Sequence, residues 1–255
     1  MKLTHGRRLS QVAGIVLGLF GATGIGMTHI VFPGLHCYAC PWAITVCPIG
    51  LVQNLVIYGT VPLFWLGSIL AYGLFAARGF CGWFCPFGTL NDLMSFRRAR
   101  IRNAFSLGKF VVLLGTLVGA WALADTVFCQ LCPAASIEAS LPYLVLGVAR
   151  VNGPFLIHMA TLAIALAGMA LVARFWCRYL CPMGALLALF NRVSLLHLEW
   201  TPSACTGCDA CVTACPMGLD PRKEHDGHNC IKCGACAETC LPDSLRLRLL
   251  RRGKP

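Results

Sequence analysis

The chain has 255 residues, of which 57% are hydrophobic and only 12% are charged. A soluble globular domain is about 25% charged, so this composition excludes an ordinary soluble enzyme and favours a protein solvated largely by lipid. The net charge is +11. A basic chain can bind nucleic acid, but the arginine-rich segment 97–102 lies between apolar stretches. That position is typical of a cytoplasmic loop of a membrane protein and argues against a nucleic-acid partner.

Four apolar segments approach the length of about 20 residues that crosses a bilayer. They cover residues 9–32, 61–77, 107–124 and 154–173. Lys and Arg gather before the first segment, between the second and third, and after the fourth. Because positive loops stay in the cytoplasm, we expect a multi-pass protein of the cytoplasmic (inner) membrane with both termini cytoplasmic. The apolar connections 42–58 and 134–148 would then form interfacial or re-entrant helices at the outer face.

The hydrophobic region repeats one pattern of cysteines. Residues 80–88 (FCGWFCPFG) match residues 176–184 (WCRYLCPMG), and each segment follows an apolar stretch and an arginine. Upstream, residues 37–41 (CYACP) pair with residues 129–133 (CQLCP). Each half therefore reads as span, C-x2-C-P, apolar connection, span, C-x3-C-P-x-G. We expect two pseudo-repeats, and by analogy with transporters such repeats often place a functional site on their shared axis.

After residue 198 the chain becomes polar and contains two runs with the spacing C-x2-C-x2-C-x3-C. Bacterial two-cluster ferredoxins bind 4Fe–4S clusters through this spacing, and the fourth cysteine of each run ligates the other cluster. Zinc sites usually use separated pairs of ligands, so two matched quartets favour iron–sulfur clusters over zinc or disulfides. The predicted ligands are Cys205, Cys208, Cys211 and Cys240 for one cluster, and Cys230, Cys233, Cys236 and Cys215 for the other.

The remaining cysteines form two groups in the apolar region. The inner group, at the expected cytoplasmic ends of the second and fourth spans, is Cys81, Cys85, Cys177 and Cys181. The outer group, near the opposite face, is Cys37, Cys40, Cys129 and Cys132, with Cys47 close by. Four thiolates are the ligand count of an iron–sulfur cluster, so each group is a candidate for a further redox metal centre. Two alternatives stay open: buried thiols that pack as small hydrophobes, and disulfides in the outer group.

These motifs resemble those of the NapH/NosR/MauN group of membrane iron–sulfur proteins, and of the NapH-like quinol dehydrogenase components in particular. The resemblance is carried by residues 81–86, residues 177–182 and the eight ferredoxin-type cysteines. It implies a quinol-oxidising electron conduit that works with a partner ferredoxin, c-type cytochrome or reductase. The group also includes members linked to cofactor maturation and to copper handling.

The fold class predicted from the sequence is a membrane all-α domain, residues 1–198, with four transmembrane helices in two pseudo-repeats. A cytoplasmic α+β two-cluster ferredoxin-like domain, residues 199–255, follows it. The predicted function is electron transfer from the quinol pool to a partner reductase or cytochrome system. Two alternatives stay open: an assembly factor that reduces or delivers a metal such as copper to another enzyme, and a non-catalytic anchor for an electron carrier. No catalytic residue is identified by the sequence.

Overall fold

The computed structural model describes residues 3–19, 30–31, 35, 37, 45–60, 63–95, 107–148 and 150–250. Helix α1 (Leu3–Leu19) covers the first part of the expected span 9–32. The rest of that span lies almost wholly outside the described residues, and so does Cys40.

The second, third and fourth expected spans coincide with helices α3 (Leu63–Phe75), α6 (Gly108–Leu123) and α10 (Gly153–Leu171). Within the described ranges, α10 is the one helix both long and apolar enough to cross a membrane. Helices α3, α6 and α2 (Pro48–Tyr58) are apolar but shorter. Large hydrophobic side chains on α3 and α6 are exposed, as for Phe64 and Trp121, which leaves an apolar outer surface. The mainly helical fold expected from the sequence is confirmed.

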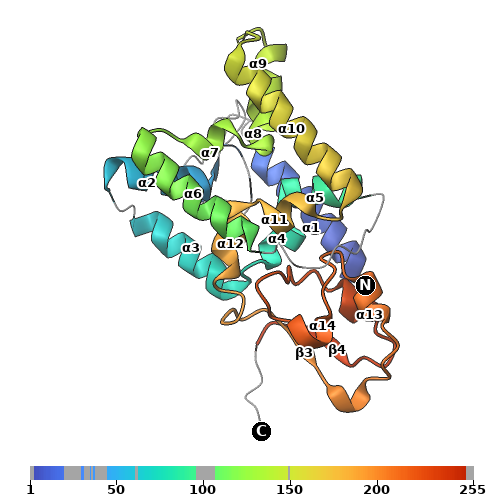
Figure 1. Ribbon diagram of the computed structural model, residues 1–255. Coiled ribbons are helices and arrows are strands. Elements are labelled where there is room, and N and C mark those ends of the chain that lie inside the picture. Colours follow the sequence, from blue (N-terminus) through green and yellow to red (C-terminus); the bar gives the residue numbers. More distant parts are fainter. Residues whose placement is uncertain are drawn as a thin grey trace.

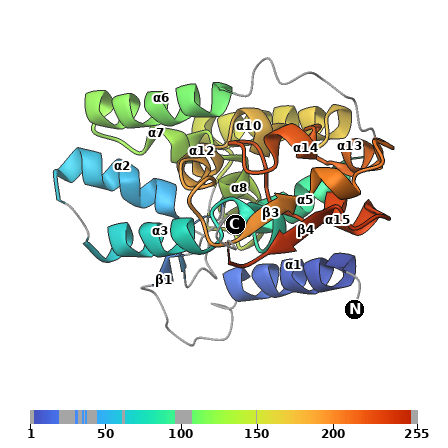
Figure 2. The same cartoon turned by 90° about the horizontal axis from the view of Figure 1, so that it is seen from below.

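The helices pack around a centre made of short segments (Figures 1 and 2). Helix α6 packs on α2 and on α12 (Pro182–Ala188), and α10 packs on α11 (Phe175–Tyr179) and on α8 (Pro133–Ala135). Helix α1 lies against α4 (Gly79–Trp83) and α5 (Pro86–Met94). One expected apolar connection contains α2. The other forms a continuous helical run of α8, a π-helical turn η3 (Ser136–Ser140) and α9 (Leu141–Val145). A short parallel pairing of β1 (Ile30–Val31) with β2 (Thr45–Val46) was not predicted.

The two C-x3-C-P motifs fold alike. In each motif a five-residue helix, α4 or α11, ends before the second cysteine, and a new helix begins at the following proline. Cys85 and Cys181 both have extended backbone angles. Proline suits the first helical position because its missing N–H would have no partner there and its φ is already helical. The Cys-Pro pair thus interrupts the helix in each motif, between the first cysteine and the proline that starts the next helix.

The C-terminal module lies at one end of the helical body (Figure 1). Strand β3 (His197–Trp200) pairs antiparallel with β4 (Leu245–Arg248). Around this pair lie η4 (Pro202–Ala204), α13 (Ala210–Ala214), α14 (Pro221–Glu224) and α15 (Ala235–Thr239). Leu198 and Leu245 form a small core with Cys211 and Cys236, so the strands support the two cysteine runs directly.

Candidate iron–sulfur sites

The eight cysteines of the C-terminal module line two separate pockets. The first encloses about 320 Å³ and its lining includes Cys205, Cys208, Cys211 and Cys240. The second encloses about 400 Å³ and its lining includes Cys215, Cys230, Cys233 and Cys236. These sets are the two quartets that the spacing predicts, with the last cysteine of each run facing the other pocket. Binding of a cluster by either quartet stays a prediction.

The four thiols of each quartet line a pocket. Across the described part of the chain, no three His, Cys, Asp or Glu side chains converge closely enough to hold one metal ion. Zinc–thiolate bonds are about 2.3 Å long, so zinc ligands must meet at one point. A 4Fe–4S cube holds its cysteines at separate corners, and a pocket ringed by spaced thiols suits it.

Backbone turns bring amide groups to these thiols. Gly207 and Gly234 have φ values of +71° and +79°, which glycine adopts at no steric cost. The backbone amides of Met217, Gly218 and Leu219 all donate toward the Cys215 thiol. Amides that point at sulfur tune the reduction potential of a bound cluster.

The inner group of cysteines is assembled at the centre of the helical body. Cys81, Cys85, Cys177 and Cys181 are all buried. The Cys85 thiol lies within electrostatic reach of Cys81 and Cys177, and the Cys181 thiol within reach of the other three. Burial raises the pKa of Cys177 to about 11, so that its thiol stays protonated unless a metal binds it. The structure therefore brings together four thiols that the sequence places 96 residues apart in two motifs.

Two arginines cross between the repeats. Arg78 donates from Nη2 to the Cys177 carbonyl at 2.8 Å, and Arg174 donates from Nη1 to the Cys81 carbonyl at 2.8 Å. Both guanidinium groups are fully buried. Because each repeat supplies the arginine for the other, the two motifs are related by an approximate twofold axis.

This exchange explains the glycine of each C-P-x-G segment. A Cβ atom added at Gly88 would lie 2.6 Å from the Cys81 carbonyl oxygen and 3.2 Å from Arg174 Nη1. A Cβ atom added at Gly184 would lie 3.3 Å from Arg78 Nη2. Any larger side chain would displace the arginine that joins the repeats.

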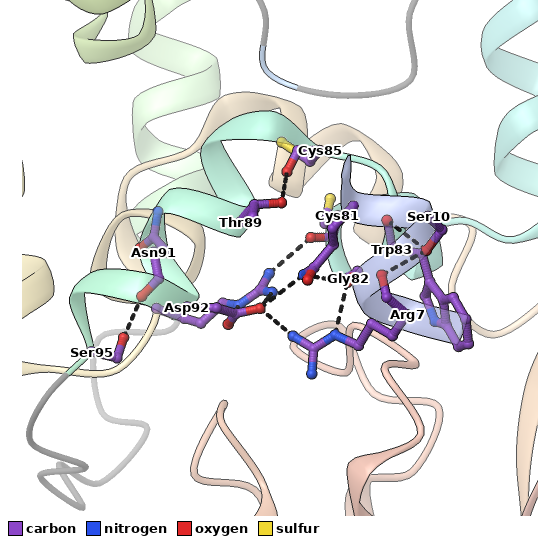
Figure 3. Close-up of polar contacts among 12 residues, drawn as sticks. Arg7, Ser10, Cys81, Gly82, Trp83, Cys85, Thr89, Asn91, Asp92 and Ser95 are labelled. Carbon is purple, nitrogen blue, oxygen red and sulfur yellow. Dashed lines mark hydrogen bonds and ion pairs between the residues drawn. The ribbon is translucent and has the colours of Figure 1, made fainter. Parts of the chain in front are cut away.

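Asp92 neutralises Arg174, one of these two arginines. Figure 3 labels Asp92 together with a further partner, Arg7. Arg174 donates from Nε to Asp92 Oδ1 at 2.7 Å, and Arg7 and Gln11 also bind this carboxylate. Burial alone would raise the pKa of Asp92, but the charges of Arg174 and Arg7 outweigh it and hold that pKa below its ordinary value. Asp92 is therefore ionised. The sequence analysis missed it, although it is the only acidic residue in the first 124 positions.

The other arginine, Arg78, meets no carboxylate among the described residues. Arg78 donates to the His228 carbonyl at 2.7 Å, and its Nε is buried without a hydrogen-bond partner. Lys109 is also fully buried, and donates to the His228 carbonyl at 2.8 Å and to Asn229 Oδ1 at 2.7 Å. Neither side chain forms an ion pair with a carboxylate among the residues described. A buried guanidinium without a counter-charge is costly, so Arg78 beside four thiols fits a site that holds an anionic thiolate centre.

The second pocket of the C-terminal module sits against the inner cysteines. A Cβ atom added at Gly82 would lie 2.7 Å from the Ile231 carbonyl oxygen and 3.4 Å from Cys233 Cβ. Next to it, Trp83 donates from Nε1 to the Lys232 carbonyl at 3.0 Å. The loop that carries Cys233 thus packs directly on the first C-x3-C motif.

The second motif touches the same pocket from the other side. A Cβ atom added at Gly218 would lie 3.2 Å from Arg178 Nη1, and Gly218 follows Cys215 by three residues. Asn191, fully buried beyond α12, donates from Nδ2 to the carbonyls of Gly227 and Cys230 at 2.7 Å each. Both repeats therefore hold the second pocket over the inner thiols.

The outer cysteines are only partly described. Cys47 and Cys132 are buried, Cys37 and Cys129 are half-buried, and Cys40 lies outside the described residues. Cys129 and Cys132 are free thiols and form no disulfide.

Sequence comparisons agree with this cysteine chemistry. A family profile described as a 4Fe-4S binding domain matches residues 58–103 and 153–200, which contain the two inner motifs. A second profile with the same description matches residues 197–219, which contain the first ferredoxin-type run. The fold and the sites thus define a cysteine-rich helical protein of the iron–sulfur class.

Relatives identify the family. Two uncharacterised proteins of Methanocaldococcus jannaschii are 30% and 28% identical to this chain; the alignments cover 77% and 78% of the chain, and 76% and 84% of the relatives. The ferredoxin-type protein NapH of Haemophilus influenzae is 27% identical over 68% of the chain and 62% of its own length. The chain belongs to the family of NapH- and MauN-type ferredoxin-type 4Fe–4S proteins. No solved structure matches it significantly.

Proposed function

We propose that this protein is a membrane-bound electron-transfer protein that passes electrons from quinol to a partner reductase or cytochrome system. The observation that carries the proposal is the contact between the second cysteine pocket and the inner thiols. The chain contains three groups of four thiols, two in the C-terminal module and one in the helical body. The second group of the module contacts the group in the helical body through Cys233 and Gly82. Such an arrangement suits a relay of redox centres, because electron tunnelling falls steeply with distance.

The proposed ligands follow from these groups. One 4Fe–4S cluster is assigned to Cys205, Cys208, Cys211 and Cys240, the second to Cys215, Cys230, Cys233 and Cys236, and a third iron–sulfur centre to Cys81, Cys85, Cys177 and Cys181. When bound, these centres supply one-electron redox chemistry.

The chain's own residues set the surroundings of the inner site. Arg78 places a buried positive charge beside the thiols, which favours a bound anion, and Lys109 donates to the same His228 carbonyl as Arg78. Arg78, Lys109 and Asn191 are fully buried, so water is excluded from the contact between the helical body and the C-terminal module. Lys232, buried and bonded to the Asn191 and Leu196 carbonyls, fixes the loop that ends at Cys233.

Membrane insertion is part of the proposal. The apolar surfaces of α3, α6 and α10 support it, as does the position of these helices at the expected spans. In this orientation the C-terminal module and the arginine-rich segment 97–102 face the cytoplasm, and both termini lie on that side. Quinol as the electron donor, and a ferredoxin or c-type cytochrome as the partner, rest on the resemblance to NapH-like quinol dehydrogenase components.

Reduction of the purified protein by quinol tests this function. The full chain is prepared anaerobically in lipid nanodiscs and mixed with a reduced short-chain quinol, and the visible iron–sulfur absorbance is followed. The proposal expects bleaching that depends on quinol concentration and that falls sharply in Cys81→Ser. Bleaching by dithionite without any bleaching by quinol would refute quinol oxidation. Release of bound copper to a thiol acceptor, without quinol-driven bleaching, would favour the metal-delivery alternative.

A further inference from the structure

A fourth group of thiols meets at the end of the helical body away from the C-terminal module. Cys129 lies on α7 (Val127–Gln130), Cys132 precedes α8, and Cys47 precedes α2. In Figure 1, α4 and α11 lie between this end and the C-terminal module. Cys47 is close enough to interact electrostatically with both Cys129 and Cys132, and Cys37 with Cys132. Three segments of the chain thus bring four sulfur atoms to one region.

The outer group is built with the same local structure as the inner one. Cys47 has φ −68° and ψ 123°, and Cys132 has φ −80° and ψ 119°. The inner residues Cys85 and Cys181 have φ −68° and ψ 120°, and φ −73° and ψ 111°. All four are followed by a proline that starts a helix. Cys47 is therefore the structural counterpart of Cys132, a relation that the spacing of the C-x2-C-P motifs did not indicate.

A buried amide is directed at this group. Gln53 is fully buried in the apolar helix α2. It donates from Nε2 to Cys129 Sγ at 3.3 Å and to the Ile49 carbonyl at 3.2 Å, and its Oε1 accepts from the Phe128 amide at 2.9 Å. Gln53 therefore holds α7 in place and aims an N–H group at a sulfur atom. A donor to sulfur stabilises a thiolate, and stabilises it more when the bound centre is reduced.

We propose that Cys37, Cys47, Cys129 and Cys132 bind a redox-active iron–sulfur centre at the outer end of the protein, with Gln53 as a positioning residue that raises its reduction potential. An all-sulfur ligand set suits iron–sulfur clusters, zinc or Cu(I). Zinc has no redox chemistry, and four cysteines are the ligand count of an iron–sulfur cluster. Among the described residues neither this group nor the cysteines of the C-terminal pockets converge on a single-ion site. The half-buried Cys37 and Cys129 place this centre near the surface, where a redox partner can approach.

Loss of one centre on removal of the outer thiols is the first test. Wild type and the double variant Cys129→Ser/Cys132→Ser are purified anaerobically, and iron, acid-labile sulfide, zinc and copper are measured beside a redox titration followed by paramagnetic resonance. The variant is expected to lose one signal and the iron and sulfide of one centre, with the other signals retained. Unchanged iron and signals overturn the proposal. So does a site that holds zinc or copper without labile sulfide, or a Cys37–Cys47 disulfide in the wild type.

A second test keeps all four ligands. In Gln53→Leu the N–H donor to Cys129 is removed, and the signal lost in the double variant should shift to a more negative potential while the iron content stays the same. Gln130→Leu is the matched control, because Gln130 adjoins Cys129 but its amide binds Asp125 at the surface. An equal shift in both variants, or none in Gln53→Leu, would remove the role given to Gln53. This test does not depend on quinol oxidation, so its failure and the failure of the proposed function are distinguishable.

Discussion

The two C-x3-C-P repeats have almost the same backbone but different neighbours. In both, a buried arginine reaches the first cysteine carbonyl of the other repeat. Arg174 of the second repeat is neutralised by Asp92. Within the described ranges, the Arg78 guanidinium of the first repeat donates to carbonyl groups only, and its buried Nε has no partner. After the first cysteine, one repeat has Gly82 under the Cys233 loop, and the other has Arg178 beside Gly218.

This difference suggests two roles: Arg174 stabilises the fold, whereas Arg78 contributes its charge to the proposed redox site. The pair of Arg174 and Asp92 is complete in itself, so it stabilises the fold whether or not a centre is bound. Arg78 has no carboxylate partner among the described residues, so an anionic thiolate centre beside it would supply the counter-charge. Because of this asymmetry, two similar motifs contact different loops of one C-terminal module. Substitutions at Arg174, Arg78, Asn191 and Gly82 test this difference between the two repeats.

Removal of Arg174 should have the largest effect on stability. Arg174→Leu leaves Asp92 partly buried, with Arg7 as its one remaining charged partner among the described residues, and loss of one member of a buried pair costs about 3–5 kcal/mol. The measurement is chemical unfolding in detergent followed by circular dichroism. Arg246→Leu, which removes an exposed ion pair with Asp243, is the control and should change little. Equal destabilisation in both would contradict the structural role of Arg174.

Removal of Arg78 should act on the inner site as well as on stability. Arg78→Gln loses charged hydrogen bonds to Cys177 and His228, each worth about 1.5–3 kcal/mol, and it loses a positive charge beside the thiols. The potential of the inner centre should become more negative in a redox titration. Arg78→Lys keeps the charge and should restore most of the potential but less of the stability. If the potential is the same in Arg78→Gln as in wild type, then Arg78 does not serve that centre.

Asn191 tests the docking of the C-terminal module. Asn191→Ala removes two donors to the loop that leads to Cys233, a loss of about 1–3 kcal/mol. Hydrogen exchange at residues 227–232 should accelerate while exchange in α10 is unchanged. Asn152→Ala, which removes only the cap of α10, should show the opposite pattern. If hydrogen exchange at residues 227–232 is as slow in Asn191→Ala as in wild type, then other contacts hold the C-terminal module in place.

Gly82 tests the closest contact between the module and the first repeat. In Gly82→Ala the new Cβ would lie 2.7 Å from the Ile231 carbonyl oxygen, so the loop must shift, at a cost of about 1 kcal/mol. The rate of electron transfer to the inner centre, measured by stopped flow, should fall clearly, while the free energy of unfolding changes by only this small amount. Gly115→Ala is the control because nothing lies within 4 Å of its added Cβ. An unchanged rate in Gly82→Ala would place the electron route elsewhere.

Local spacing predicted part of this architecture and tertiary contacts decided the rest. The four cysteines around each C-terminal pocket follow from the two short runs, three from one run and the last from the other, so sequence alone indicates this grouping. The link between Arg78 and Cys177 joins residues 99 positions apart, and no pattern in either motif specifies it. The same is true of Asp92 with Arg174 and of Asn191 with Cys230. The sequence placed Cys47 merely close to the outer group, because the helix start that makes it equivalent to Cys132 is visible only once α2 and α8 are formed.

The most direct measurement is the magnetic interaction between reduced centres in the full chain. If the inner thiols hold an iron–sulfur centre beside the Cys233 pocket, paramagnetic resonance of the fully reduced wild type will show a broadened, spin-coupled signal. In Cys81→Ser/Cys177→Ser this component will disappear, and the spectrum will become that of a two-cluster module alone. A wild-type spectrum identical to that of the double variant, with identical iron content, would contradict the account.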